Sequence, residues 1–82
     1  MEVIVRKVKS DDWEALYINN NKVDEGHKIE IKDVCDSLEY LIESRGVTIN
    51  KIKGENYYLN EEYAEDNGFP LEFSEIPEDM FE

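Results

Sequence analysis

Hydrophobic and polar residues alternate along the first part of the chain, a pattern typical of β-strands. The segment MEVIVRKVK predicts a strand over residues 2–9, and WEALYI predicts a second strand over residues 13–18. A run of three asparagines follows, and asparagine tolerates the positive φ that a tight hairpin needs. We therefore expect Asn20 and Asn21 to form the hairpin loop, and KVDEGHKIEI to return as the third strand.

The register of this hairpin decides where the only histidine lies. In a regular register without a bulge, Ile18 faces Val23, Ala15 faces Gly26, and Glu14 lies opposite His27. A β-bulge at Gly26 is the alternative, because glycine inside a strand often marks an extra residue. A shift of one residue would move His27 to the opposite face of the sheet.

The spacing of apolar residues then changes to that of a helix in DVCDSLEYLIESRG. Asp33 is a suitable N-cap, and Gly46 can adopt the left-handed conformation that ends a helix. The apolar stripe of this helix consists of Val34, Leu38, Leu41 and Ile42. Cys35 flanks the stripe and is expected to pack in the core or at its edge. After the helix, a fourth strand is expected at VTINKIK, residues 47–53.

The C-terminal part predicts a short helical turn followed by an extended tail. Asn60 can cap the turn, and Asn67 with Gly68 can end it. Apolar and aromatic side chains recur every few residues over 57–73, so we expect this stretch to pack on the domain. From about Pro77 onward few such side chains remain, and we expect the chain to be mobile there.

These elements predict one α+β domain over residues 1–82. It consists of an antiparallel sheet of three to four strands with one main helix on one face, followed by the short helical turn and an acidic tail. One helix covers only one face of a sheet. The other face, lined by Trp13 and Tyr17, needs cover from the tail or from a second copy of the chain.

Charge divides the chain into two unequal parts. Residues 1–53 hold 11 acidic and 9 basic residues, whereas residues 54–82 hold 10 acidic residues and no lysine or arginine. Direct binding to nucleic acid or to an anionic membrane needs cationic side chains, so both are excluded as expected partners. A basic protein surface remains as the expected partner.

Six aromatic residues interrupt the carboxylates of this acidic, aromatic-rich segment, residues 54–82. The plainer interpretation is a tail that keeps the protein soluble. Rings rimmed by acids are also what a surface needs to dock on a basic protein. We therefore hypothesise a non-enzymatic binding protein or inhibitor that imitates nucleic-acid charge. The analogy with small acidic phage proteins that occupy nucleic-acid sites on host enzymes suggests a phage-type inhibitor of a host protein. Its expected binding residues are Glu61, Glu62, Tyr63, Glu65, Asp66, Glu72 and Glu75. The alternative is a self-assembling protein that dimerises through Trp13 and Tyr17.

The sequence contains no catalytic or cofactor motif, and we expect neither a cofactor nor a metal. An acid–base group of Glu14, Glu25 and His27 is the one enzymatic arrangement to test. One histidine with carboxylates is weak evidence for zinc, and a chain of 82 residues has little room for a pocket. We therefore interpret His27 as structural. The single cysteine and the absence of a long apolar run favour a cytoplasmic protein.

The stretch DDWEALYINNNKVDEGHKIEIKDVCDSLEYL resembles a family of short bacterial and phage proteins of uncharacterised activity. That family carries a W-E-x-L-Y motif, a tight turn, and an E-G-H-x-I motif running into a helix. The resemblance implies a phage or mobile-element setting and no particular chemistry. The matching residues are Trp13, Glu14, Leu16, Tyr17, Glu25, Gly26, His27 and Ile29.

Overall fold

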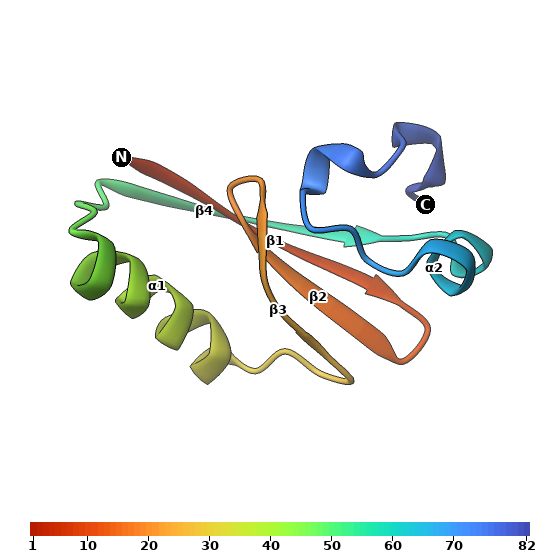
Figure 1. The fold of residues 1–82 in the computed structure, drawn as a ribbon, viewed down its shortest axis with the longest axis horizontal. Helices are drawn as coiled ribbons and strands as arrows, with labels where there is room; N and C mark the ends of the chain where they lie inside the picture. Colours follow the sequence, from red (N-terminus) through yellow and green to blue (C-terminus); the bar gives the residue numbers. More distant parts are fainter.

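The computed structural model describes residues 1–82 as a four-stranded sheet between two layers (Figure 1). The main helix lies against one face, and the C-terminal segment covers the other. This confirms the predicted α+β class with one main helix. The elements in chain order are β1 (Glu2–Ser10), β2 (Trp13–Ile18), β3 (Asn21–Gly26), α1 (Ile31–Arg45), β4 (Lys51–Tyr58), α2 (Glu61–Asn67) and two 3₁₀ turns, η1 (Phe73–Glu75) and η2 (Glu78–Met80).

The sheet is mixed, with the strand order β3-β2-β1-β4. Strands β1, β2 and β3 pair antiparallel, but β4 pairs parallel with β1, from Glu2 opposite Lys51 to Lys9 opposite Tyr58. Helix α1 carries the chain back between β3 and β4, so β4 runs in the same direction as β3 and β1. The expectation of a purely antiparallel sheet is corrected in this respect, and the fourth strand begins later than residue 47.

The β2–β3 hairpin differs from the expected register by a shifted loop and a bulge. Asn19, with φ 57°, and Asn20 form the loop, and Ile18 pairs with Asn21. Leu16 pairs with Asp24 and Tyr17 with Lys22, which leaves Val23 as the extra residue of a bulge. Strand β3 therefore ends at Gly26, opposite Glu14, and His27 lies beyond the paired region.

Helix α1 is only loosely packed on the sheet. It begins at Ile31, earlier than predicted, because Asp33 Oδ2 accepts a hydrogen bond from the Glu30 backbone N–H at 2.8 Å and caps the helix from its first turn. Gly46 ends it with φ 65°, as predicted. No residue of α1 is buried, and Cys35 is exposed instead of packed. Neither helix combines the length and the hydrophobicity needed to cross a bilayer.

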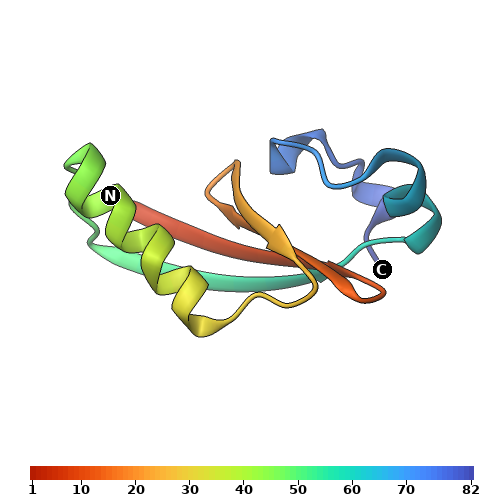
Figure 2. The same cartoon turned by 60° about the horizontal axis from the view of Figure 1, so that its bottom comes forward.

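The best-packed core lies on the other face of the sheet, beneath the C-terminal segment (Figure 2). Its buried residues are Val8, Ala15, Tyr17, Leu59 and Ile76. The stretch from Pro77 onward, expected to be mobile, also packs here. Leu59 forms a β-bridge with Phe81, and the Glu82 N–H donates to the Tyr58 carbonyl at 2.7 Å.

Candidate functional site: the acidic C-terminal layer

Residues 59–82, which we call the C-terminal layer, are fastened to the sheet by hydrogen bonds from β2 and β3. The Tyr17 hydroxyl donates to the Pro70 carbonyl at 2.7 Å, and Lys22 Nζ donates to the Phe69 carbonyl at 2.9 Å. The Lys22 backbone N–H donates to the Leu71 carbonyl at 2.8 Å. The layer is therefore attached along its middle as well as through its continuity with β4.

The aromatic rings of the acidic segment face their own sheet. The ring centroid of Phe73 lies 5.6 Å from that of Tyr17, 5.1 Å from that of Tyr57 and 5.4 Å from that of Phe81. The guanidinium carbon of Arg6 lies 4.5 Å from the Phe73 ring centroid, within the range of a cation–π contact. These rings form the inner face of the layer, which packs on the sheet.

This arrangement changes the role expected for the rings in partner binding. Tyr63, one of the predicted binding residues, is half-buried against the core cluster. Among the six rings of residues 54–82 only Tyr58 is exposed, with 59% of its surface accessible. The interleaving of rings with acids is thus explained by packing within the chain itself.

The carboxylates of the layer point the other way, into solvent. On α2, Tyr63 and Ala64 pack against the core, while the four acidic side chains of the helix are exposed. Asn60 Oδ1 accepts from the Tyr63 N–H at 3.0 Å and caps this helix, as predicted. The exposed carboxylates of the layer are those of Glu61, Glu62, Glu65, Asp66, Glu72, Glu75, Glu78, Asp79 and Glu82.

None of these nine carboxylates belongs to an ion pair. Every ion pair in the chain joins residues of the sheet, of α1 or of their connections, where all the basic residues lie. Glu75 has one local role, because its Oε1 accepts a hydrogen bond from the Glu72 N–H at 2.9 Å. The structure has no cluster of three or more acidic, histidine or cysteine side chains that could hold a metal ion. The layer is thus a surface of unneutralised negative charge.

The structure places Glu14 apart from Glu25 and His27, the other two residues of the hypothetical acid–base group. His27 packs its ring edge-on against Trp13, with centroids 4.8 Å apart, and its Nδ1 lies 3.6 Å from Asp12. Glu25 accepts a hydrogen bond from Trp13 Nε1 at 3.3 Å. Glu14 is buried on the α1 side of the sheet and accepts from the Ile29 N–H at 2.8 Å. The three side chains do not converge on one point.

Trp13 and Tyr17, the expected self-association residues, have different environments. Tyr17 is completely buried beneath the C-terminal layer, while Trp13, the first residue of β2, retains 36% of its surface. The tail thus covers the sheet face that otherwise required a second copy. Tyr17 has no surface for another chain while the layer stays docked.

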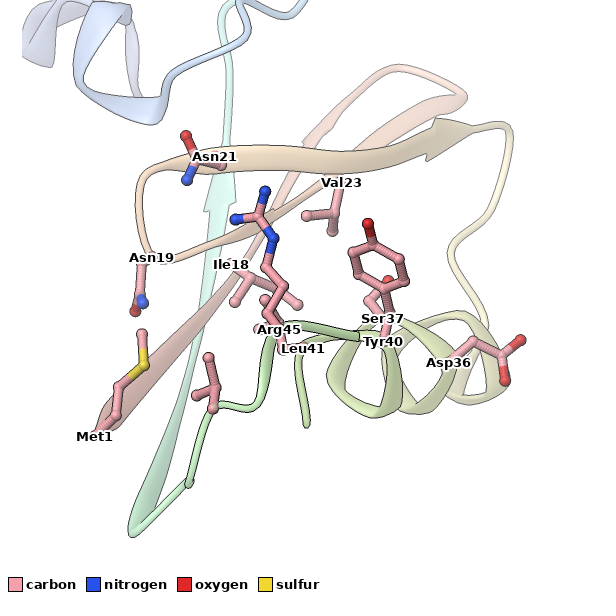
Figure 3. Close-up of a pocket in the computed structure, with 11 residues that line it drawn as sticks. Met1, Ile18, Asn19, Asn21, Val23, Asp36, Ser37, Tyr40, Leu41 and Arg45 are labelled. Carbon is pink, nitrogen blue, oxygen red and sulfur yellow. The ribbon is translucent and has the colours of Figure 1, made fainter. Parts of the chain in front are cut away.

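A groove of about 660 Å³ lies on the opposite side of the sheet, between α1 and the β2–β3 hairpin (Figure 3). Tyr40 and Arg45 extend from α1 toward β3, and Arg45 belongs to no ion pair. The sequence did not indicate this groove, because the apolar stripe of α1 was expected to pack closely on the sheet. Its apolar lining consists of Met1, Ile18, Val23, Tyr40, Leu41 and Val47.

Comparison of the chain with protein-family models, with curated proteins and with solved structures finds no match. The resemblance to short bacterial and phage proteins therefore stays a prediction. Its motif residues have structural roles in this fold: Leu16 and Tyr17 are buried in the sheet, and Glu14 binds the linker that leads to α1.

Proposed function

We propose that this protein is a non-enzymatic acidic binding protein that docks through its C-terminal layer on a basic, nucleic-acid-binding surface of another protein. The observation that carries the proposal is the set of nine exposed carboxylates, none of them neutralised by a base. Such a surface attracts the lysine and arginine clusters that otherwise contact phosphates. The partner is therefore defined by its positive charge.

The inward orientation of the rings determines what kind of binding to expect. Few apolar groups of the acidic segment are free to contact a partner, chiefly Tyr58 and Leu71, which is 73% exposed. Charge must then supply most of the recognition, which favours fast association and strong dependence on salt. This differs from binding through aromatic anchors, which would persist at high salt.

Attachment of the layer to the sheet also favours binding. A disordered acidic arm would lose conformational freedom when it docks, whereas a folded layer has lost most of that freedom already. Helix α2 fixes Glu61, Glu62, Glu65 and Asp66 relative to one another and to the sheet. A partner would thus meet a preformed pattern of charge.

The test compares two variants with equal net charge. In the layer variant, Glu61, Glu62 and Glu65 are changed to Gln and Asp66 to Asn. In the control variant, Asp11 and Asp24 are changed to Asn and Glu39 and Glu43 to Gln. All four residues lie outside the layer and form no ion pair; Asp24 is half-buried and the other three are exposed. Each variant loses four negative charges, so only the location of the loss differs.

Immobilised wild-type protein is expected to capture basic nucleic-acid-binding proteins from a bacterial lysate at low salt. About 0.5 M salt should release them, because exposed charges are then screened, and added duplex DNA should displace them. The layer variant should lose about tenfold or more in affinity for such a protein, while the control variant keeps most of it. A partner retained at high salt, unaffected by DNA, or lost equally from both variants would contradict the proposal.

A further inference from the structure

The C-terminal layer covers only part of each outer strand edge. On the outer edge of β3, Asn21 forms a bridge with Glu72, and the Lys22 N–H donates to Leu71. At the far end of β4, Glu82 and Phe81 cover Tyr58 and Leu59 in the same way. The outer edge of β4 over residues 52–56 has no such cover. Free strand edges of this kind are templates for pairing with another strand.

The outward-facing backbone groups on this edge follow from alternation along the strand. The Leu59 N–H donates inward to the Lys9 carbonyl of β1, and the Tyr58 carbonyl accepts outward from Glu82. Strand β4 pairs with β1 without irregularity, so its residues alternate in direction. The N–H and C=O groups of Ile52, Gly54 and Asn56 therefore point away from the sheet.

We propose that this edge binds the same edge of a second copy of the chain, as an antiparallel pair about a twofold axis at Gly54. Gly54 then lies opposite the partner's Gly54, and Ile52 opposite the partner's Asn56. All three outward-facing residues exchange backbone hydrogen bonds with the partner strand. The two four-stranded sheets join into one sheet of eight strands, and the C-terminal layer of each copy stays free.

The charges on β4 favour this pairing register over the two registers shifted by one residue. Lys53 lies opposite the partner's Glu55 and Glu55 opposite the partner's Lys53, at non-hydrogen-bonded positions where side chains are closest. Moving the axis to Glu55 would oppose two glutamates, and moving it to Lys53 would oppose two lysines. Both alternatives place like charges directly across the pair, which is destabilising.

The fold of a single chain does not explain why position 54 is a glycine. Gly54 does not adopt positive φ, and a Cβ added there would meet no atom within 4 Å. Glycine inside a strand weakens it, so a fold that does not need the glycine is expected to hold another residue there. Close approach of a second backbone is one of the conditions that favour strand glycine.

The expected dimer is weak. Five residues of strand edge bury less than a standard protein interface, and the net charge of −12 on each chain opposes association. We expect a dissociation constant on the order of 10–100 µM at physiological salt. Lower salt should weaken the dimer, because the repulsion between the two chains is then less screened.

Sedimentation equilibrium over a range of protein concentrations tests the proposal with three variants. Gly54→Pro removes an outward N–H that β1 does not use, and proline is tolerated on such an edge. Lys53→Glu places a glutamate against the partner's Glu55. Lys51→Glu is its matched control, with the same change in net charge, because Lys51 lies opposite the partner's Tyr57 in this register.

The wild type and Lys51→Glu should dimerise, Lys53→Glu should do so at least about tenfold more weakly, and Gly54→Pro should stay monomeric with an unchanged circular dichroism spectrum. A wild type that is monomeric at about 1 mM overturns the proposal. Equal dimerisation of Lys53→Glu and Lys51→Glu also overturns the proposal. This comparison tests the proposal even if Gly54→Pro fails to fold. None of these variants alters the C-terminal layer, so failure here is distinct from failure of the proposed function.

Discussion

The hydroxyl of Tyr17 donates a hydrogen bond to the backbone carbonyl of Pro70 at 2.7 Å, across 53 residues of chain. Tyr17 is completely buried at the centre of the sheet, and Pro70 lies in the C-terminal layer. This contact joins the part of the chain that holds every basic residue to the part that holds none. It therefore helps to fix the acidic surface on which the proposed function depends.

Removal of this hydrogen bond should lower stability. Tyr17→Phe keeps the ring but leaves the Pro70 carbonyl without its partner, so we expect a loss of about 1 kcal/mol in the free energy of unfolding. Urea denaturation measures it. Tyr58→Phe is the control, because the Tyr58 side chain is largely exposed and should change stability by less than about 0.5 kcal/mol. Equal stability of the two variants would contradict this role for Tyr17.

Alkaline pH should weaken the fold through the same residue. Burial, with smaller contributions from Glu25 and Glu75, raises the pKa of Tyr17 above its ordinary value of about 10. The folded state then keeps this proton longer than the unfolded state. The stabilising contribution is complete below about pH 10 and is lost as pH rises from there toward the folded pKa.

The stability difference between wild type and Tyr17→Phe should therefore shrink between about pH 9 and about pH 11. The hydrogen bond to Glu55 and, to a smaller extent, burial also raise the pKa of Tyr57. Tyr57 is present in both proteins, so its effect on the difference cancels. Unfolding free energies measured at both pH values provide the test. A difference that stays constant would show that Tyr17 ionises alike in the folded and unfolded states.

Phe73 should contribute far more to stability than its neighbour Leu71. Phe73 packs among Tyr17, Tyr57 and Phe81, whereas Leu71 is 73% exposed. We expect Phe73→Ala to cost about 2–4 kcal/mol, because it leaves a cavity beneath the layer. Leu71→Ala should cost less than about 0.5 kcal/mol. Thermal denaturation of the two variants is the measurement, and similar losses would show that the layer is not docked as described.

A second pair of substitutions compares the two faces of the sheet. Leu59 is 1% exposed in the core beneath the C-terminal layer, and Leu41 on α1 is only half-buried beside the groove. Leu59→Ala should therefore cost about 2–4 kcal/mol, and Leu41→Ala less than about 1.5 kcal/mol. Denaturant titration measures both. A larger loss at Leu41 would mean that α1 packs more closely in solution than the structure shows.

Local signals in the sequence predicted most of the elements correctly. The strand alternation at the N-terminus, the cap at Asn60 and the left-handed end at Gly46 each depend on residues close together in the chain. The hairpin register was predicted wrongly. Three successive asparagines are compatible with several loop positions, and the sequence pattern does not indicate the bulge at Val23.

Long-range relationships were harder to predict. The parallel pairing of β4 follows from the path of α1, since a helix between two strands of one sheet commonly makes them parallel. The antiparallel sheet was instead predicted from the hairpins, which require antiparallel pairing of neighbouring strands. The inward direction of the rings in the layer could not be read from their spacing, because rings that face a partner and rings that face the chain's own sheet alternate with acids in the same way.

The central claim is that the carboxylates stand on a folded layer docked on the sheet of the free protein. Hydrogen exchange of the free protein, followed residue by residue, tests it most directly. Amides that bond across the contact should exchange at least about 100-fold more slowly than in an unstructured chain: Lys22 to Leu71, Phe73 to Asn20, and Glu82 to Tyr58. Unprotected exchange throughout residues 59–82, beside a protected β1–β2 pair, would contradict the account and show a disordered acidic arm.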